Sequence, residues 1–528
     1  MPIVVTRPRL VADCVGEGQG GDVAKAFRVD LPTLLKLRYP DPQRYLAELI
    51  RHSVTRNAKR IRIVPADVNR GQFQISDDGD MTVPDGRLPG EDGLVAGLLV
   101  SDSVTLTSAG TKWVGRISGT HTTTAVDDDL TGTTVTLRRR RGETLLNTSK
   151  VVELARRYAE MSPIPVDVSM PGGATQTVNR QPPWLCEKPL EIAEYGAELL
   201  DADPLDLVAL KKPTGETFGV AYILPTSPAP RAVQKHSLYR DGLLLEDEGA
   251  DLLPEWAFFA RCVLDAGALP DDRDEARAQL GQSLRSWLLL LSARQPRRLT
   301  QFVNTHHLSL KIHAAQDPEL ARIITRWLPF ETSAGRLTLT ELLGRTRHVR
   351  YATTRDVFRQ LAPIAGRNTP FVNAGHLHDV KLLEQLPDLY DDVTVERVEV
   401  ADIVADLDDP PLSDRVAQLR LRKVADSALA ATGCATVVKS FEPASLPVLY
   451  LGDPATLCLN HRSPIIQHLA RLSDQTVLSR TVQLLHAQAR LHGHLPLRGV
   501  DTELLSGALL DLVQLAALEE DLSGLDHG

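Results

Sequence analysis

The segment that decides the fold reads DPQRYLAELIRHSVTRNA over residues 41–58. Its leucine, isoleucine and valine residues recur at helical spacing, which predicts a helix with one apolar face. Asp41 as the N-cap and Pro42 at the first helical position mark where this helix starts. Strands are predicted next at residues 60–64 and 73–76. A helix followed by strands favours a mixed α/β unit.

Three polar side chains share one face of the predicted helix. Glu48, His52 and Thr55 are separated by four and three residues, so they stack on the same side. After the strand at 73–76, Asp77 enters a turn that contains Gly79. A helix face and a strand end of this kind can line one polar pocket. A solvated helix face beside an ordinary acidic turn is the alternative interpretation of the same residues.

Helix and strand signals continue to alternate along the chain. Residues 93–104 are predicted to be a buried helix or strand, and the Pro- and Gly-containing segment 170–183 a sheet edge or a linker. The last helix carries an apolar stripe from Leu505 to Ala516 that requires a partner helix. The other main elements are predicted as strands at 112–117, 133–139, 219–224 and 237–246, an apolar run at 257–265, and helices at 149–161, 274–291 and 318–328.

Composition limits the function classes. At about 150 residues per domain, 528 residues correspond to three to four domains. The net charge of −9 opposes non-specific nucleic-acid binding. No apolar run approaches the ~20 residues that span a bilayer, and no secretory signal is recognisable. We therefore expect a cytoplasmic, soluble protein that binds neither nucleic acid nor membrane. The five cysteines, which form no C-x-x-C pair, are expected to be reduced thiols: Cys14, Cys186, Cys262, Cys434 and Cys458.

The order of several short motifs resembles the heat shock protein 90 family of the bacterial HtpG type, in particular its actinobacterial members. The resemblance extends from about Ala26 to the C-terminus and lies in the collinearity of the motifs. Motifs similar to the ATPase domain of that family are at residues 27–31, 45–50, 73–79, 99–102 and 132–135; those similar to its middle domain are at 219–225, 252–259 and 327–332; those similar to its C-terminal domain are at 459–464 and 491–498.

The resemblance implies an α/β fold built from three domains after an N-terminal arm at residues 1–25. Residues 26–168 would form a two-layer α+β sandwich of the GHKL type that binds ATP. Residues 169–404 would form an α/β middle domain that contacts clients. Residues 405–528 would form a short α+β domain that dimerises through its C-terminal helices.

The resemblance also implies roles for individual residues of an ATP site. Glu48 would orient the attacking water, and Asp77 would accept a hydrogen bond from the adenine amino group. Gly79 would let the backbone approach the base, and Thr133 would bond near the adenine. Arg273 is the nearest equivalent of the arginine that reaches the γ-phosphate.

Other positions depart from the family pattern. His52 stands where the family has the asparagine that binds magnesium, and an imidazole is a poor replacement for a hard oxygen ligand. The ATP lid is reduced to residues 82–89. Gly93 ends a shortened phosphate loop in which Glu91 and Asp92 would repel phosphate. We therefore expect that the only cofactor, if the chain binds one, is ATP, and that its binding lacks the normal dependence on magnesium. Hydrolysis of ATP is expected to be weak or absent.

Two functions follow from these expectations. The first is a chaperone that binds client polypeptides as a homodimer. The second is a nucleotide-independent scaffold or holdase that keeps the same fold as a platform. The remaining clusters are interpreted as structural. The histidines at 306, 307, 313, 376 and 378 are not expected to form a metal site, and the basic run 138–141 is expected to be a solvated strand end. The glycines of 16–21 are expected to belong to a loose arm without a dinucleotide site.

Overall fold

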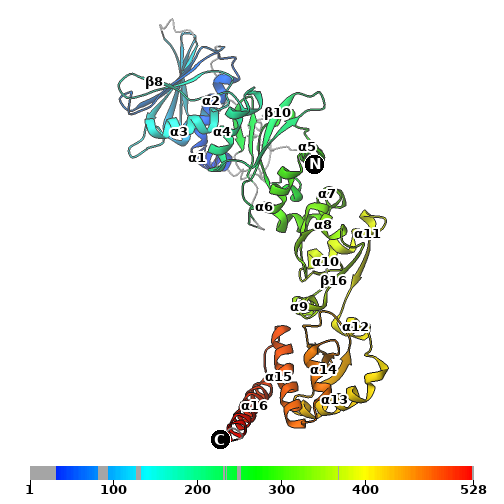
Figure 1. Ribbon diagram of the computed structural model, residues 1–528. Helices are drawn as coiled ribbons and strands as arrows, with labels where there is room; N and C mark the ends of the chain where they lie inside the picture. Colours follow the sequence, from blue (N-terminus) through cyan, green and yellow to red (C-terminus); the bar gives the residue numbers. More distant parts are fainter. Residues whose placement is uncertain are drawn as a thin grey trace, which may run out of the picture. The chain divides into compact units, whose positions relative to one another are not determined.

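The computed structural model describes residues 31–80, 93–126, 132–229, 232, 235–246, 251–366 and 368–525 (Figure 1). The predicted arm at 1–25, the lid at 82–89 and the residues Gly90 to Asp92 lie outside these ranges. The fold is mixed α/β, as expected from the sequence. The chain forms two compact units, Met1–Trp287 and Leu288–Gly528.

The first unit opens with an eight-stranded sheet in the order β5-β4-β3-β6-β2-β1-β7-β8. Neighbouring strands are antiparallel except for the parallel pair β1 and β7. The strands are β1 (Ile61–Val64), β2 (Gln72–Asp77), β3 (Ser101–Ser108), β4 (Thr111–Arg116), β5 (His121–Ala125), β6 (Thr133–Arg139), β7 (Val166–Ser169) and β8 (Thr175–Thr177).

Helices cover one face of this sheet. Buried positions alternate with partly exposed ones along β2, β3 and β6, the pattern of a sheet that buries one face. Tyr45, Leu46 and Ile50 of the covering layer are fully buried. Figure 1 shows α2 and α3 along the sheet. The layer consists of α1 (Leu31–Arg38), α2 (Arg44–Val54), the 3₁₀ helix η1 (Leu94–Leu99) and α3 (Thr148–Ala159).

The predicted helix at 41–58 is present but shorter. Asp41 accepts a hydrogen bond from the backbone N–H of Gln43 (2.9 Å), so it closes a turn before α2 and does not cap it. The helix ends at Val54, and Asn57 adopts a positive φ of 58°. Residues 93–104 contain both predicted alternatives, since η1 leads into β3. The segment 170–183 carries β8, an edge strand, as predicted.

A five-stranded sheet in the order β12-β11-β13-β10-β9 completes the first unit. The single strand predicted at 237–246 is a hairpin, because Gly242 at φ 72° turns the chain. The elements are α4 (Pro189–Leu200), β9 (Asp206–Lys211), β10 (Thr217–Ile223), β11 (Ser237–Arg240), β12 (Leu243–Glu246), β13 (Ala260–Asp265) and α5 (Arg273–Arg294), with short 3₁₀ turns η2 (Pro183–Leu185), η3 (Glu255–Ala257) and η4 (Ala266–Ala268).

The second unit contains two sheets, in the orders β15-β14-β17-β16-β18 and β19-β21-β20. The strands are β14 (Pro329–Thr332), β15 (Gly335–Thr338), β16 (His348–Ala352), β17 (Phe371–Asn373), β18 (Thr394–Arg397), β19 (Ala435–Lys439), β20 (Val448–Gly452) and β21 (Ala455–Asn460). The helices are α6 (Pro296–Ala314), α7 (Pro318–Ile324), η5 (Thr325–Trp327), α8 (Leu339–Leu343), α9 (Arg355–Leu361), η6 (Ala362–Ile364), α10 (Leu377–Glu384), α11 (Leu386–Leu389), α12 (Val400–Ala405), η7 (Leu412–Asp414), α13 (Arg415–Ala428), η8 (Ala430–Thr432), α14 (Pro464–Arg471), α15 (Gln475–His492) and α16 (Gly499–Leu525).

One apolar cluster joins the two sheets of the second unit. Phe358 and Phe371 beside the five-stranded sheet belong to the same buried cluster as Leu449 and Cys458 of the three-stranded sheet. The domain boundary predicted at 404/405 passes through this cluster.

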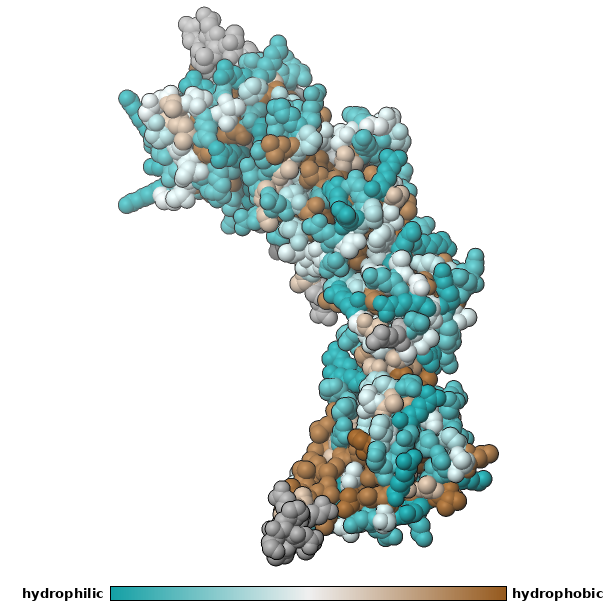
Figure 2. Space-filling view, viewed as in Figure 1, coloured by the Kyte–Doolittle hydropathy of each residue, from teal (hydrophilic) through white to brown (hydrophobic). Residues whose placement is uncertain are grey.

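The predicted terminal helix is α16. Ala508 and Asp501 of this helix are buried, at 0% and 1% exposure, whereas Leu509 and Val513 are 50% and 65% exposed. Figure 2 shows apolar side chains gathered along α16. Across the described ranges, no helix combines the length and the apolar character needed to cross a membrane.

Candidate nucleotide site

Four elements of the first unit bring buried polar groups together: α2, the ends of β2 and β3, and the start of β6. Asp77, the last residue of β2, lies directly opposite Thr133, the first residue of β6. Thr133 in turn lies opposite Ser108, the last residue of β3. Two predicted site residues, Asp77 and Thr133, are therefore neighbours at one end of the sheet.

Asp77 is the central acceptor of the cluster. Its side chain is 8% exposed. Oδ2 accepts a hydrogen bond from Ser53 Oγ of α2 (2.6 Å), and Oδ1 accepts one from the backbone N–H of Gly79 (3.0 Å). A carboxylate has about four acceptor positions, so Asp77 retains capacity for a further donor such as a ligand amino group.

Thr133 is also buried, at 2% exposure. Its hydroxyl shares a 3.0 Å hydrogen bond with Ser108 Oγ, which also lies within hydrogen-bond distance of the carbonyl of Gly132 (3.2 Å). A side chain at Gly132, whose φ is 95°, would overlap the carbonyl oxygen of Asp77. Glycine at this position therefore allows the chain entering β6 to run against the end of β2.

Gly79 has a structural role that the sequence prediction did not include. A Cβ atom at Gly79 would lie 2.5 Å from the carbonyl oxygen of Arg56. The glycine thus lets the turn after β2 pack against the chain that leaves α2. The next carboxylate, Asp78, accepts hydrogen bonds from the backbone N–H groups of Lys59 and Arg60, and these bonds hold its pKa below the ordinary value.

Glu48 and His52 are both buried on α2, at 6% and 4% exposure. Glu48 Oε1 forms a 2.9 Å ion pair with Arg51, a partner that the sequence prediction did not include. Thr55, predicted on the same face, is exposed, and its hydroxyl donates to the carbonyl of His52 (3.0 Å). The predicted polar face therefore reduces to Glu48 and His52, because Thr55 lies beyond the last helical residue.

Gly93 brings η1 close to α2. A Cβ atom at Gly93, whose φ is 73°, would lie 2.6 Å from the carbonyl oxygen of Glu48. This observation gives Gly93 a packing role beside Glu48.

Arg273 begins α5 and is exposed. Among the described residues, neither Glu48 nor Asp77 forms a hydrogen bond or ion pair with it. The role of Arg273 beside a γ-phosphate stays a prediction.

Ser53 is a cluster member that the sequence prediction missed. It continues the apolar side of α2 that carries Leu46, Leu49 and Ile50, and its side chain is 2% exposed. A hydroxyl on the apolar face of a helix requires a buried partner. That pattern was the available signal for a contact with Asp77.

The other charged clusters have structural explanations. The Arg140 guanidinium bonds to Asp102 (2.7 Å) and to the carbonyls of Leu98 and Ser101, so it closes the bulge at the start of β3. His306 is fully buried in α6. In the described part of the chain, no group of three or more His, Cys, Asp or Glu side chains is placed to hold a metal ion.

The residues of this cluster are better suited to bind the base of a nucleotide than to bind the magnesium ion that accompanies its phosphates. The Asp77 carboxylate can accept a hydrogen bond from an amino group of the base. At the position where a magnesium ligand is expected, the chain offers the imidazole of His52, and magnesium prefers oxygen.

Comparison with known proteins gives a limited match. No protein-family model matches the chain. Over 197 residues the chain is 27% identical to the chaperone protein HtpG of Paramagnetospirillum magneticum (strain AMB-1). The match covers 34% of this chain and 32% of that protein, so it spans about a third of the relative's length.

Proposed function

We propose that this chain is a chaperone of the heat shock protein 90 type that binds client polypeptides in the cytoplasm and hydrolyses ATP weakly or not at all. The observation that carries the proposal is the buried Ser53–Asp77 hydrogen bond, with Thr133 opposite Asp77 in the sheet. The similarity to HtpG supports the same assignment.

In this proposal Asp77 reads the adenine. Ser53 and the N–H of Gly79 hold the carboxylate in one orientation, because each donates to a different oxygen. The remaining acceptor positions of Asp77 would take the exocyclic amino group, with Thr133 beside it. A buried acceptor of fixed orientation gives such a site specificity for one base.

Hydrolysis is expected to be weak for two reasons. Phosphoryl transfer depends on positioned charges and metal ions, and His52 is a poor magnesium ligand. In addition, Glu48 Oε1 is already paired with Arg51 at 2.9 Å. A general base must lie within hydrogen-bond reach of the water that it activates, and this ion pair competes for the carboxylate.

A nucleotide-independent holdase is the second candidate. His52 favours this candidate because an imidazole is a poor magnesium ligand. An exposed apolar ridge on η7 and α13 also favours it. Leu412 and Val416 are each 82% exposed and Leu419 is 59% exposed. Val416 and Leu419 are three residues apart on one side of α13, and Leu412 lies in the turn η7 that precedes it. Exposed apolar groups of this kind suit contact with unfolded chains.

The proposal includes a homodimer formed through α16. The exposed Leu509, Leu510 and Val513 follow each other along this helix, and a twofold pairing would bury them against their own copies.

Calorimetric titration of the full-length chain with ATP, with and without magnesium, tests the first proposal. We expect ATP to bind, with little dependence on magnesium, and Glu48→Ala to leave an already low turnover unchanged. A robust turnover that Glu48→Ala abolishes would contradict weak hydrolysis. An absence of ATP binding, together with suppressed aggregation of a denatured client, would favour the holdase.

A further inference from the structure

We propose that the corner between α5 and α6 is a docking surface for an acidic segment of a partner protein that also carries leucine-like side chains. The corner surface consists of Leu289, Leu290, Arg294, Arg297 and Arg298. All five residues belong to the second unit, and the proposal depends neither on nucleotide binding nor on the apolar ridge of η7 and α13.

The charge distribution along these two helices differs from that of the whole chain. From Ala276 to Gln316 the sequence contains no Asp or Glu, whereas it contains six Arg or Lys residues. The whole chain, in contrast, carries a net charge of −9. Clustered charges of one sign create a local potential that attracts the opposite sign. This part of the surface therefore favours an acidic partner, although the protein as a whole does not.

Three exposed arginines concentrate this charge at the corner. Arg294 is the last residue of α5, and Arg297 and Arg298 lie in the first turn of α6. Among the described residues, neither Arg294 nor Arg297 pairs with a carboxylate. Arg298 donates a 2.6 Å hydrogen bond to Oε1 of Gln295, an uncharged group. Guanidinium groups bind carboxylates through two parallel hydrogen bonds, so acidic side chains of a partner fit here.

The start of α6 departs from the pattern that stabilises a helix. Its first turn contains no acid, and Gln295 at the N-cap makes no capping hydrogen bond through its side chain. The N-terminus is the positive end of the helix dipole, which disfavours the cations of Arg297 and Arg298. Residues that break a local rule of stability are expected at functional sites. Their placement therefore indicates a role in binding.

Two exposed leucines lie beside the arginines. Leu289 and Leu290 of α5 are 51% and 45% exposed. Leu290 precedes Arg294 by four residues, so the two side chains share one face of the helix. Leucine beside arginine suits a polypeptide that offers apolar groups and carboxylates together. Single-stranded nucleic acids are bound by aromatic stacking, and membranes by a broad apolar helix face, and the corner surface has neither feature.

Fluorescence anisotropy with the full chain and labelled peptides tests the proposal. We expect the peptide DELLEDLLDELL to bind and its affinity to fall as the salt concentration rises, because exposed charges are screened. Two matched peptides separate the contributions. DESSEDSSDESS lacks the leucines, and KKLLKKLLKKLL reverses the charge. Each should bind at least about tenfold more weakly.

Charge reversal at the start of α6 locates the site. Arg297→Glu combined with Arg298→Glu should weaken binding of DELLEDLLDELL at least about tenfold. The same change places acids at the positive end of the helix dipole, so the melting temperature should stay the same or rise. A loss of affinity without a loss of stability cannot result from unfolding. Arg355→Glu is the matched control, because Arg355 is an exposed arginine of α9 in the same unit.

The leucines are tested in the same assay. Leu289→Ser combined with Leu290→Ser should weaken binding about tenfold. Leu308→Ser should not, although Leu308 is 67% exposed, because it lies about three helical turns beyond Arg297.

Three results would each overturn the proposal: no binding of DELLEDLLDELL, equal binding of either matched peptide, or unchanged affinity after charge reversal at Arg297 and Arg298. Duplex DNA and phosphatidylserine vesicles are the remaining probes. If either binds through these two arginines while the peptide does not, the surface serves another class of partner and the proposal is wrong.

Discussion

Ser53 Oγ lies 2.6 Å from Asp77 Oδ2, and this hydrogen bond ties the last turn of α2 to the end of β2. The two side chains are 2% and 8% exposed. The Asp77 carboxylate is therefore oriented by the protein itself, before any ligand is present, and it is the feature on which the proposed base recognition depends.

Asp77→Asn should abolish most nucleotide affinity. The amide keeps the size of the side chain, but its NH₂ group is itself a donor. It would have to face either the Ser53 hydroxyl or the backbone N–H of Gly79, which both donate to the carboxylate in the native chain. We expect at least a tenfold loss of ATP affinity and a destabilisation of about 1–3 kcal/mol. Calorimetry and urea unfolding measure the two effects.

Ser53→Ala is the control for this change. It removes one of the two donors that orient the carboxylate and leaves the acceptor in place, so it should cost about 1 kcal/mol of stability and weaken ATP binding less than Asp77→Asn does. Wild-type affinity in Asp77→Asn would mean that Asp77 has only a structural role.

His52→Asn should make nucleotide binding respond to magnesium. The substitution supplies an amide oxygen at the position where the chain now has an imidazole, and magnesium favours oxygen ligands. ATP titrations with and without magnesium should differ in His52→Asn and agree in His52→Ala. If the two variants behave alike, position 52 does not face the metal.

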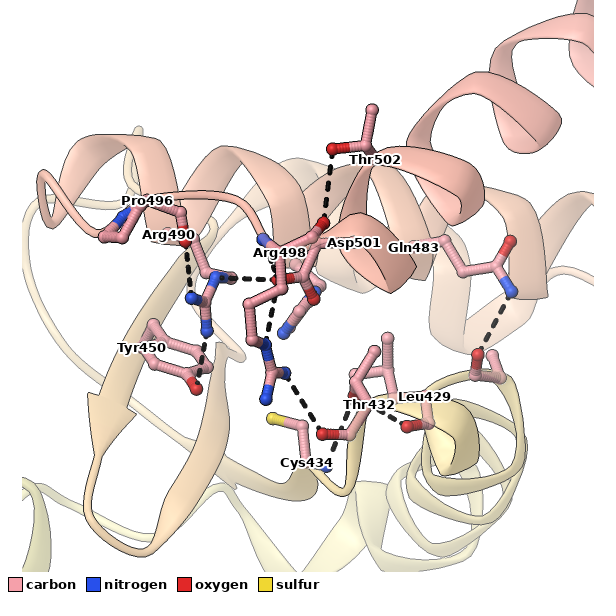
Figure 3. A network of polar contacts seen from close by, with 12 residues as sticks. Leu429, Thr432, Cys434, Tyr450, Gln483, Arg490, Pro496, Arg498, Asp501 and Thr502 are labelled. Atoms are coloured by element: carbon pink, nitrogen blue, oxygen red, sulfur yellow. Dashed lines mark hydrogen bonds and ion pairs between the residues drawn. The ribbon is translucent and has the colours of Figure 1, made fainter.

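Asp501→Asn should destabilise the second unit strongly. The carboxylate is fully buried, and Oδ2 lies 3.2 Å from Nε of both Arg490 and Arg498 (Figure 3). Loss of its charge leaves Arg490 buried without a counter-ion, which costs about 3–5 kcal/mol. Asp511→Asn, on the same helix, breaks the one-third-exposed pair with Arg480 and should cost less than about 1 kcal/mol. Similar unfolding midpoints for the two variants would argue against this difference.

The stability of the second unit should fall as the pH drops from about 6.5 to 4. Burial lowers the pKa of His486 to about 4, although the nearby Asp501 carboxylate opposes this shift; the charges of Arg490 and Arg498 add to it. Between the two values the unfolded chain binds a proton that the folded chain does not, so protonation favours unfolding.

His486→Gln should flatten this part of the pH profile of urea unfolding. Burial alone would raise the pKa of Asp501, but hydrogen bonds from Arg498 and the charges of Arg490 and Arg498 hold it below its ordinary value. The stabilisation that the ionised Asp501 gives to the folded state is therefore lost only when the pH falls below the ordinary pKa of an aspartate. This range lies below the one in which His486 acts. An unchanged profile in His486→Gln would show that other groups set the dependence.

Leu509→Glu combined with Val513→Glu should convert the proposed dimer into a folded monomer. Both side chains are at least half exposed and are one helical turn apart on α16, so they belong to the same face. Gln514→Glu adds charge at a neighbouring exposed position and should leave the dimer intact. Light scattering measures the mass of each variant, and a wild-type chain that is already monomeric would refute the interface.

Periodicity and turn residues predicted most elements of the first unit, but several helices were missed, among them α1 and α4 of the first unit and α6 of the second. α4 contains Gly196, which resembles a helix breaker in the sequence, yet a side chain there would overlap the ring of Tyr222. α6 begins at Pro296, and its apolar face is interrupted by His306, which is buried. In both helices tertiary packing explains the residue that obscures the helical pattern.

The candidate site was predicted in part. Asp77 and Thr133 were expected together, and the antiparallel register of β2 and β6 makes them neighbours. The ion pair of Glu48 with Arg51 and the bond from Ser53 depend on side-chain orientation, which spacing alone does not determine. The position of Arg273 depends on packing between distant segments.

The apolar cluster shared by the two sheets of the second unit makes their unfolding cooperative. Phe358 and Phe371 are covered by the same core as Leu449 and Cys458, so neither sheet can open without exposing the other. A fragment that starts at residue 405 would lose more than half of the buried residues of this core and should aggregate.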